Sequence, residues 1–249
     1  MSTTVPIIKQ IIGGPSDFGI GWIIILISSV IAILVAFATF SKWLYEKIQK
    51  KRRFLKTLSL LTIGTNIDYF KTLLGNPVFI NKVGNYDEFI FVNPYFYVQA
   101  IVNSQGKIVL FSITTRNKRF NPILNIGGGD FSVKLGKTTF SKLMKEPEKV
   151  FKRGGDHGGF DFYSEVYYFG NPGHYLNYAF SINENVYDAF SYVPLSFLEN
   201  TPDNPDEIKK FRNENIINTY TVIGSLEEKE IEENGIEFGP MRSQIRTLN

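Results

Sequence analysis

Residues 18–41 read FGIGWIIILISSVIAILVAFATFS, a run of 24 residues without a charged side chain. About 20 apolar residues in an α-helix, each rising about 1.5 Å, cross the roughly 30 Å hydrocarbon core of a bilayer. Trp22 and Trp43 stand 21 positions apart, and tryptophan concentrates at the two interfaces of a membrane. The stretch therefore predicts one transmembrane helix, with these two tryptophans at its borders.

Basic side chains follow the apolar stretch at once, whereas its N-terminal side offers only Lys9. They are Lys42, Lys47, Lys50, Lys51, Arg52, Arg53 and Lys56. Positive charge stays on the cytoplasmic side, so we expect the N-terminus outside and residues 42–249 in the cytoplasm. Lys50, Lys51, Arg52 and Arg53 form the densest part of this membrane anchor. They serve either as a topology determinant in loose contact with anionic lipid or as a specific lipid site.

A cleaved signal peptide is the alternative, and it would send the domain outward. Three features argue against it: the apolar run is too long, no basic region precedes it, and no small-residue cleavage site follows.

The charge of the chain excludes one class of function. The net charge is +3, residues 1–41 sum to zero, and residues 42–56 sum to +6, which leaves −3 for residues 57–249. An acidic domain is a poor nucleic-acid binder, because the affinity for nucleic acid comes mainly from basic side chains that neutralise phosphates.

The chain has no cysteine, which excludes disulfides, thiolate metal sites and cysteine nucleophiles and suits a reducing compartment.

The soluble part contains the same order of elements twice. A glycine, a short helix and a proline open each repeat: Gly64 to Pro77, with Thr65 or Asn66 as N-cap, and Gly136 to Pro147, with Thr138 or Thr139 as N-cap. Three extended segments then follow in each, at 88–92, 96–103 and 107–115, and at 162–169, 175–182 and 186–193. The pair Asn93-Pro94 recurs as Asn171-Pro172, 78 positions later. We predict an α+β fold: one transmembrane helix, then a duplicated helix plus antiparallel β-meander domain.

The expected organisation has six parts. They are an extracytoplasmic N-terminus (1–17), the transmembrane helix (18–41), a basic juxtamembrane helix (42–62), two α+β repeats (63–126 and 127–198) and an acidic C-terminal segment (199–249). Within the last part we predict a charged helix in 203–215, a strand at 220–223 and a flexible, solvated stretch at 227–233.

The first repeat resembles the BamE family of small lipoproteins and the tandem form of that fold in β-lactamase inhibitory protein. The matching residues are Gly64, Leu74, Gly75, Pro77, Tyr97, Val98, Gly106, Lys107 and Val109. The resemblance implies a binding module rather than an enzyme. The chain departs from the family by lacking a lipidated cysteine and facing the cytoplasm. Taken whole, it resembles a group of bacterial single-pass proteins, which implies the bacterial cytoplasmic membrane.

Aromatic and basic strand residues are the candidate binding site. They are Tyr95, Tyr97, Tyr167 and Tyr175, with Arg116 and Arg119 at the end of a strand. The tyrosines either fill the core or form an exposed face that grips a partner. Besides the lipid bilayer, we expect an unknown protein partner or self-association.

No catalytic constellation assembles in the sequence. His157 lies in a glycine-rich stretch with Asp156 and Asp161, which is too few ligands for a metal or an acid–base site. We therefore expect no cofactor, no metal and no enzyme, but a membrane-anchored cytoplasmic binding or signalling module that acts through protein–protein contacts. The alternatives are a ligand-sensing membrane effector, for example in bacterial defence, that oligomerises and perturbs the bilayer, and a hydrolase that uses His157.

Overall fold

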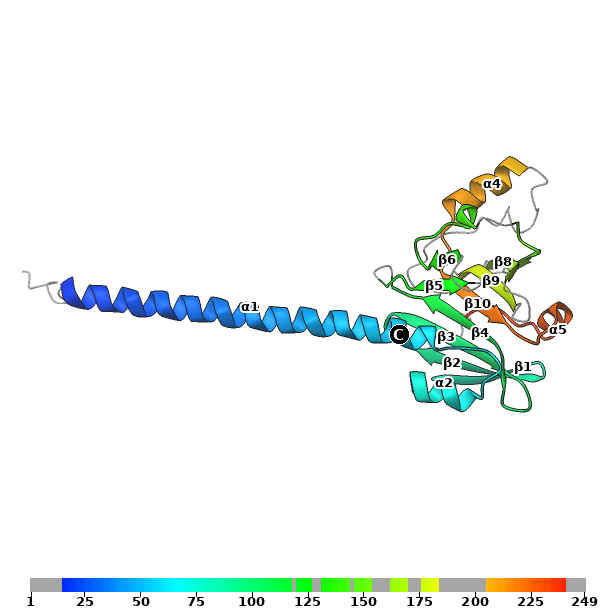
Figure 1. The fold of residues 1–249 in the computed structure, drawn as a ribbon, viewed down its shortest axis with the longest axis horizontal. Coiled ribbons are helices and arrows are strands. Elements are labelled where there is room, and N and C mark those ends of the chain that lie inside the picture. Colours follow the sequence, from blue (N-terminus) through cyan, green and yellow to red (C-terminus); the bar gives the residue numbers. More distant parts are fainter. Residues whose placement is uncertain are drawn as a thin grey trace, which may run out of the picture. The chain divides into compact units, whose positions relative to one another are not determined.

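The computed structural model describes residues 15–117, 120–126, 131–143, 146–153, 162–169, 176–183 and 205–240. The chain divides into two units, residues 1–54 and residues 55–249, and each is described by itself (Figure 1).

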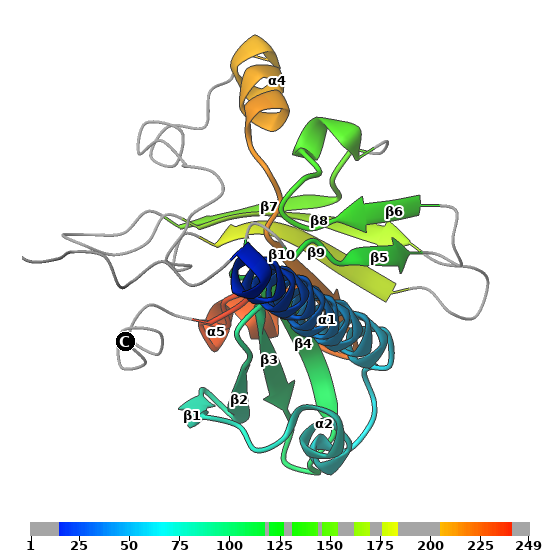
Figure 2. The ribbon, with the colours of Figure 1, turned by 90° about the vertical axis from the view of Figure 1, so that its left-hand side faces the viewer.

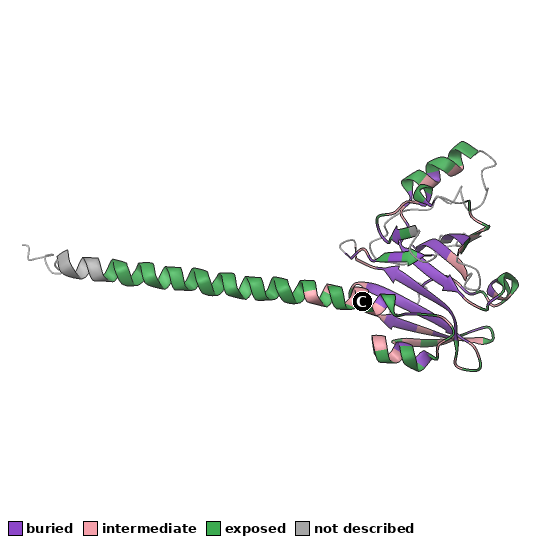
Figure 3. Cartoon of the chain, viewed as in Figure 1, coloured by how far each residue is buried: buried purple, intermediate pink, exposed green. Residues whose placement is uncertain are grey.

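Helix α1 (Pro15–Ser59) contains the whole predicted membrane segment. Its side chains from residue 21 to residue 48 are almost all exposed, including Trp22 at 58% and Phe37 at 69% (Figure 3). Hydroxyl groups within the apolar stretch donate to backbone carbonyls four residues earlier, as Ser29 does to Ile25 at 2.8 Å, so they are satisfied without water. From residue 21 onward the helix is long and apolar enough to cross a membrane, which fits the predicted anchor.

The soluble unit is built on one antiparallel sheet of eight strands, whose order can be followed in Figure 2. In spatial order the strands are β1 (Phe79–Val83), β2 (Tyr86–Val92), β3 (Phe96–Val102), β4 (Ile108–Thr115), β10 (Thr219–Ile223), β9 (Leu176–Asn183), β8 (Phe162–Phe169) and β7 (Lys149–Arg153). A separate hairpin joins β5 (Ile123–Ile126) to β6 (Phe131–Lys134). The remaining helices are α2 (Ile67–Leu74), the 3-10 helix η1 (Phe140–Lys142), α4 (Pro205–Glu214) and α5 (Glu228–Glu233).

Helix α2 begins at a cap that the sequence predicts, but it ends at Leu74, before the predicted end at Pro77. The Asn66 side chain accepts a hydrogen bond from the Asp68 amide at 2.9 Å, and the helix ends before Gly75, whose φ is 87°. Its apolar face buries Phe70 completely, and that ring meets Phe91 and Phe111 of the sheet with centroids 6.4 and 5.6 Å away. The cap fixes the start of the helix, and the aromatic contacts hold it on one face of the sheet.

The opposite face of the sheet is covered by the segment that follows β10. Ile231 of α5, Ile236 and Phe238 are buried in one apolar cluster with Ile101 and Leu110 of the sheet. The Gly239 amide donates to Gln99 Oε1 at 2.7 Å. Because both faces are covered, every residue of β3, β4 and β10 is buried.

Three expectations for the second half of the domain need correction. The predicted helix after Gly136 is only the three-residue η1. Residues 186–193 lie outside the described part of the chain, and the strand that pairs with β9 on the β4 side is β10. The stretch 227–233 forms α5, because Glu227 and Glu230 cap it reciprocally and Ile231 is buried, at 4% exposure.

Two segments far apart in the sequence make the same backbone contacts. The Gly64 amide donates to the Ile108 carbonyl at 2.8 Å, and the Ile108 amide donates to the carbonyl of residue 65 at the same distance. The Gly136 amide donates to the Ile217 carbonyl at 2.8 Å, and the Ile217 amide donates to the carbonyl of residue 138 at 2.9 Å. Each glycine segment is thus tied to the start of a central strand, β4 in one case and β10 in the other.

The turn between β1 and β2 provides a test of these contacts. Gly84 has a φ of 58°, and a Cβ added there would overlap the side-chain amide of Asn234, which accepts a hydrogen bond from the Asn85 amide at 3.0 Å. We expect Gly84→Ala to lower the free energy of unfolding of the full-length protein in detergent by about 2–4 kcal/mol, through backbone strain and the lost contact. Gly235→Ala is the matched control, since Gly235 has a φ of 63° but open space around it. Urea unfolding measures the free energy of unfolding of both variants. If Gly84→Ala and Gly235→Ala lose the same amount, the Asn234 contact contributes nothing to stability.

Candidate functional site

One pocket of about 530 Å³ lies on the central strands of the soluble unit. Its floor is formed by Phe111 and Ile113 of β4, Tyr220 and Val222 of β10, and Tyr178 of β9. Strand register places Ile113 beside Tyr220 and Val222 beside Tyr178, so these side chains share one face. We call this site the tyrosine pocket.

Two segments wall the tyrosine pocket. One is the end of α1 and the residues after it, including Leu55, Leu58 and Thr62. The other is residues 121–125 at the start of the β5–β6 hairpin. The Asn121 amide donates to the Leu135 carbonyl at 3.0 Å, which fixes this second wall. None of the described residues that line the pocket carries a charge.

The two tyrosines of the floor are its buried polar groups. Tyr220 is 6% exposed and Tyr178 is half-buried, and their rings stack with centroids 6.0 Å apart. Burial raises the pKa of both hydroxyls, and the neighbouring Tyr178 raises the pKa of Tyr220 further. Both are therefore neutral at pH 7. Within the described part of the chain, neither hydroxyl makes a hydrogen bond to the protein, so both remain available to a ligand.

A second polar cluster lies under α4, and its side chains bond to one another. The Glu165 carboxylate, completely buried, accepts hydrogen bonds from the hydroxyls of Tyr163, at 2.6 Å, and Tyr167. Arg212 of α4 places its Nε 3.0 Å from Glu165 Oε1. Burial raises the pKa of Glu165, while the hydrogen bonds and the Arg212 charge oppose that shift. The cluster ties α4 to β8, and we assign it a structural role.

The aromatic residues predicted to grip a partner do not form an exposed face. Tyr97 is 1% exposed and Tyr167 is 0% exposed, because both faces of their sheet are covered. Arg116 stacks its guanidinium 4.8 Å from the centre of the Tyr97 ring, and Tyr95 is half-buried against Phe120 with centroids 5.2 Å apart. For Tyr97 and Tyr167, the prediction of an accessible binding surface is wrong. Tyr175 and Arg119 lie outside the described residues, as does His157 with its two aspartates.

The residues assigned to the anchor all lie on α1. Trp22, Trp43, Lys50, Arg52 and Arg53 are exposed, and Lys51 is half-buried. Lys47 holds its ammonium 4.7 Å from the centre of the Trp43 ring, a pairing that joins a cation to an interfacial aromatic.

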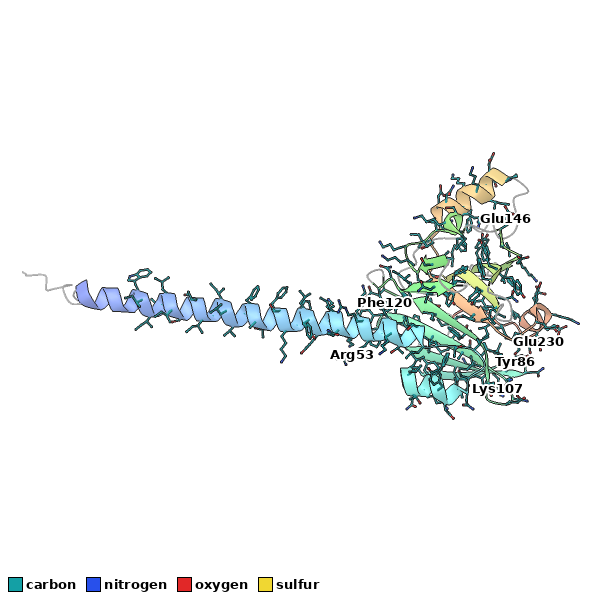
Figure 4. The ribbon with its side chains drawn as sticks, viewed as in Figure 1. Arg53, Tyr86, Lys107, Phe120, Glu146 and Glu230 are labelled. Atoms are coloured by element: carbon teal, nitrogen blue, oxygen red, sulfur yellow. The ribbon has the colours of Figure 1, made fainter. Side chains whose placement is uncertain are left out.

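The residues that the structure describes contain no group of three His, Asp or Glu side chains that could hold a metal ion. Elsewhere the acidic side chains make structural contacts: the Tyr86 hydroxyl donates to Glu230 at 2.8 Å and joins β2 to α5 (Figure 4).

Sequence reasoning missed the tyrosine pocket. The sequence predicts strands at 175–182 and 220–223, but nothing in it indicates that these strands lie beside β4 and beneath residues 55–63. The one usable signal is the alternation of Tyr220 and Val222 in a predicted strand, which places both on the same face.

Comparisons with known proteins assign no family. No family model and no curated protein matches the chain. Among solved structures, a cysteine-rich secretory protein from Staphylococcus aureus subsp. aureus Mu50 is similar over 66% of this chain and 43% of its own, with 11% identity and a TM-score of 0.36. The match spans less than half of that protein, and a similarity at this level assigns neither fold nor function. The resemblance to the BamE family stays a prediction.

Proposed function

We propose that this protein is a membrane-anchored binding module, in which α1 anchors the chain and the soluble unit captures a ligand in the tyrosine pocket. The observation that carries the proposal is the composition of the pocket wall. Leu55, Leu58 and Ser59 belong to the last turns of α1, the same helix that contains the apolar stretch. Filling the pocket would change the surroundings of these turns, which offers a physical route from ligand capture to signalling.

A bound molecule should therefore accompany the protein during mild purification. We expect native mass spectrometry of the full-length protein to detect a small molecule that is lost in Thr62→Trp, a substitution at an exposed position of the wall. Indole would occupy much of the space without removing any buried contact. The proposal fails if the wild type and the Thr62→Trp variant carry the same molecules.

The cytoplasmic location of the soluble unit is part of the proposal and is supported by the basic residues of α1. A reporter fused after Asn249 should be active in the cytoplasm and silent outside it. Neutral residues in place of Lys50, Lys51, Arg52 and Arg53 should weaken that preference, because positive charge near the helix end sets orientation. Neutral residues at Lys209 and Lys210, exposed on α4, are the control and should leave it unchanged. A wild-type fusion that reports from outside would reverse the assignment.

We infer further that the sheet contains two copies of one unit, with β10 rather than residues 186–193 as the last strand of the second copy. The matched backbone contacts support this. Ile217 lies 109 positions after Ile108, and the same separation relates Ser112 to Thr221. These two residues face each other in the register of β4 and β10, with their hydroxyls 2.7 Å apart. If a two-fold axis relates the two copies, that axis passes between Ser112 and Thr221. The tyrosine pocket would then lie where the two copies meet.

A self-associating membrane effector is the second candidate function, favoured by one face of α1. Ser28, Ala32 and Ala36 recur at four-residue spacing in a shallow apolar hollow of the helix, and small residues at this spacing let transmembrane helices approach closely. Cysteine crosslinking at Ala32 in membranes would yield dimers under this candidate and monomers under the first. The protein partner expected from the sequence stays a prediction.

A further inference from the structure

We infer that the tyrosine pocket binds an uncharged, mainly apolar small molecule that carries one hydrogen-bonding oxygen, such as a hydroxyl or a carbonyl. The inference rests on the proposed function, because it names the ligand class of the same site. Three properties of the pocket define that class: its size, the lack of charge among its described lining residues and the tyrosine hydroxyls of its floor.

The size of the pocket suits a small organic molecule. A volume of about 530 Å³ falls within the range of roughly 300–1,000 Å³ that is usual for ligand sites. Most of the lining is aliphatic or aromatic, with Leu58 and Leu61 buried on one side and Phe111 and Val222 on the floor. An apolar body would gain from leaving water there, in proportion to the area it buries.

The described residues of the lining carry no charge and therefore favour an uncharged ligand over an ionic one. A carboxylate, phosphate or ammonium group would lose its hydration on entry and meet no opposite charge to replace it, which is costly. The polar side chains of the lining are uncharged amides and hydroxyls, and the amide of Asn121 is already engaged with the Leu135 carbonyl.

The tyrosine hydroxyls are the hydrogen-bonding groups that the floor of the pocket offers to a ligand. Tyr220 is more than nine-tenths buried, and its side chain lines the pocket. An oxygen on the ligand would accept a hydrogen bond from this hydroxyl, and Tyr178 stacks beside it as a second donor. The ligand therefore needs a polar oxygen at one end of an apolar body.

Three probes of one shape separate these requirements: 2-naphthol, 2-naphthoate and naphthalene. We would measure their binding by equilibrium dialysis against the full-length protein in lipid nanodiscs, with Thr62→Trp nanodiscs as the blank for partition into lipid. We expect saturable binding of 2-naphthol and at least about tenfold weaker binding of 2-naphthoate. Tyr220→Phe should weaken the binding of 2-naphthol by about 3–10-fold, which is the contribution of one neutral hydrogen bond. The variant should then bind 2-naphthol about as weakly as the wild type binds naphthalene. Tyr168→Phe, at an exposed position of β8, should leave binding unchanged.

The outcomes distinguish this inference from the proposed function. If 2-naphthoate binds as tightly as 2-naphthol and Thr62→Trp abolishes both, the pocket is a ligand site and only the ligand class is wrong. If Tyr220→Phe binds 2-naphthol as the wild type does, the role of the hydroxyl is overturned. If no probe shows saturable binding that Thr62→Trp removes, the inference and the proposed function both fail.

Discussion

Replacing Arg212 by methionine should lower the free energy of unfolding by about 3–5 kcal/mol at pH 8, because it leaves a buried carboxylate without its cation. Glu165 is completely buried, and the Arg212 side chain is 18% exposed, so solvent does little to replace the lost charge. The substitution also removes hydrogen bonds from Arg212 to the Phe140 carbonyl, at 3.2 Å, and to the Tyr167 hydroxyl, at 3.1 Å. Urea unfolding of the full-length protein in detergent would measure the loss.

The size of this loss should depend on pH. Burial raises the pKa of Glu165 in the folded state, so the folded protein keeps the proton to a higher pH than the unfolded chain does. Such a group contributes stability that is fully present below its unfolded pKa, near 4.3, and is lost as pH rises through the folded pKa. Without Arg212 the folded pKa rises further, because the cation favours the charged carboxylate. The deficit of Arg212→Met should therefore be smaller near pH 4.5 than at pH 8.

Two further variants isolate the charge. Adding Glu165→Gln to Arg212→Met should recover most of the stability at pH 8, because an amide needs no cation. Lys210→Met, at an exposed position of the same helix, should change stability by less than about 0.5 kcal/mol. A deficit that is the same at pH 4.5 and at pH 8 would contradict the assignment of Glu165 as the titrating group.

Local signals in the sequence predicted most elements correctly, because each is encoded by a few neighbouring residues. The polar N-cap at Asn66 defines the start of α2, alternation defines β3, and a charged stretch closed by a buried Phe211 defines α4. The start of α5 is equally local, since Glu227 and Glu230 cap it. The acidic composition of residues 227–233 is typical of a solvated stretch and conceals this helix, although Ile231 provides an apolar residue that can be buried.

Long-range pairing accounts for what the sequence could not predict. β10 enters the sheet between β4 and β9, and no local pattern encodes which strands become neighbours. The same topology decides the burial of Tyr97 and Tyr167. The alternation of side chains along a strand assigns residues to the two faces of a sheet, but it does not indicate whether the second face is exposed to solvent. Here the segment containing Phe238 covers the face of Tyr97, and Arg212 of α4 lies against Tyr167 on the opposite face. The tyrosine pocket is formed by three segments that are distant in the sequence: the end of α1, residues 121–125 and the central strands. Local patterns in the sequence therefore could not predict it.

Placing two aspartates in the apolar stretch, Ile27→Asp with Leu34→Asp, should move most of the protein out of the membrane. An aspartate near the centre of a transmembrane helix costs about 2.5–3.5 kcal/mol, and the pair therefore about 5–7 kcal/mol. Residues 18–41 contain 14 Leu, Ile, Val and Phe residues, of which 12 remain in the variant. Each favours insertion by about 0.3–0.6 kcal/mol, so together they contribute about 4–7 kcal/mol. The two sums nearly cancel, and the preference for the bilayer disappears.

Alkaline carbonate extraction of membranes measures this shift, since it releases proteins that do not span the bilayer. The wild type should stay in the pellet, and the double-aspartate variant should pass largely into the supernatant. Ile27→Ala with Leu34→Ala is the matched control, because it shortens the same two exposed side chains without adding charge, and it should remain in the pellet. A double-aspartate protein that resists extraction as the wild type does would mean that α1 is held by contacts with protein rather than by lipid.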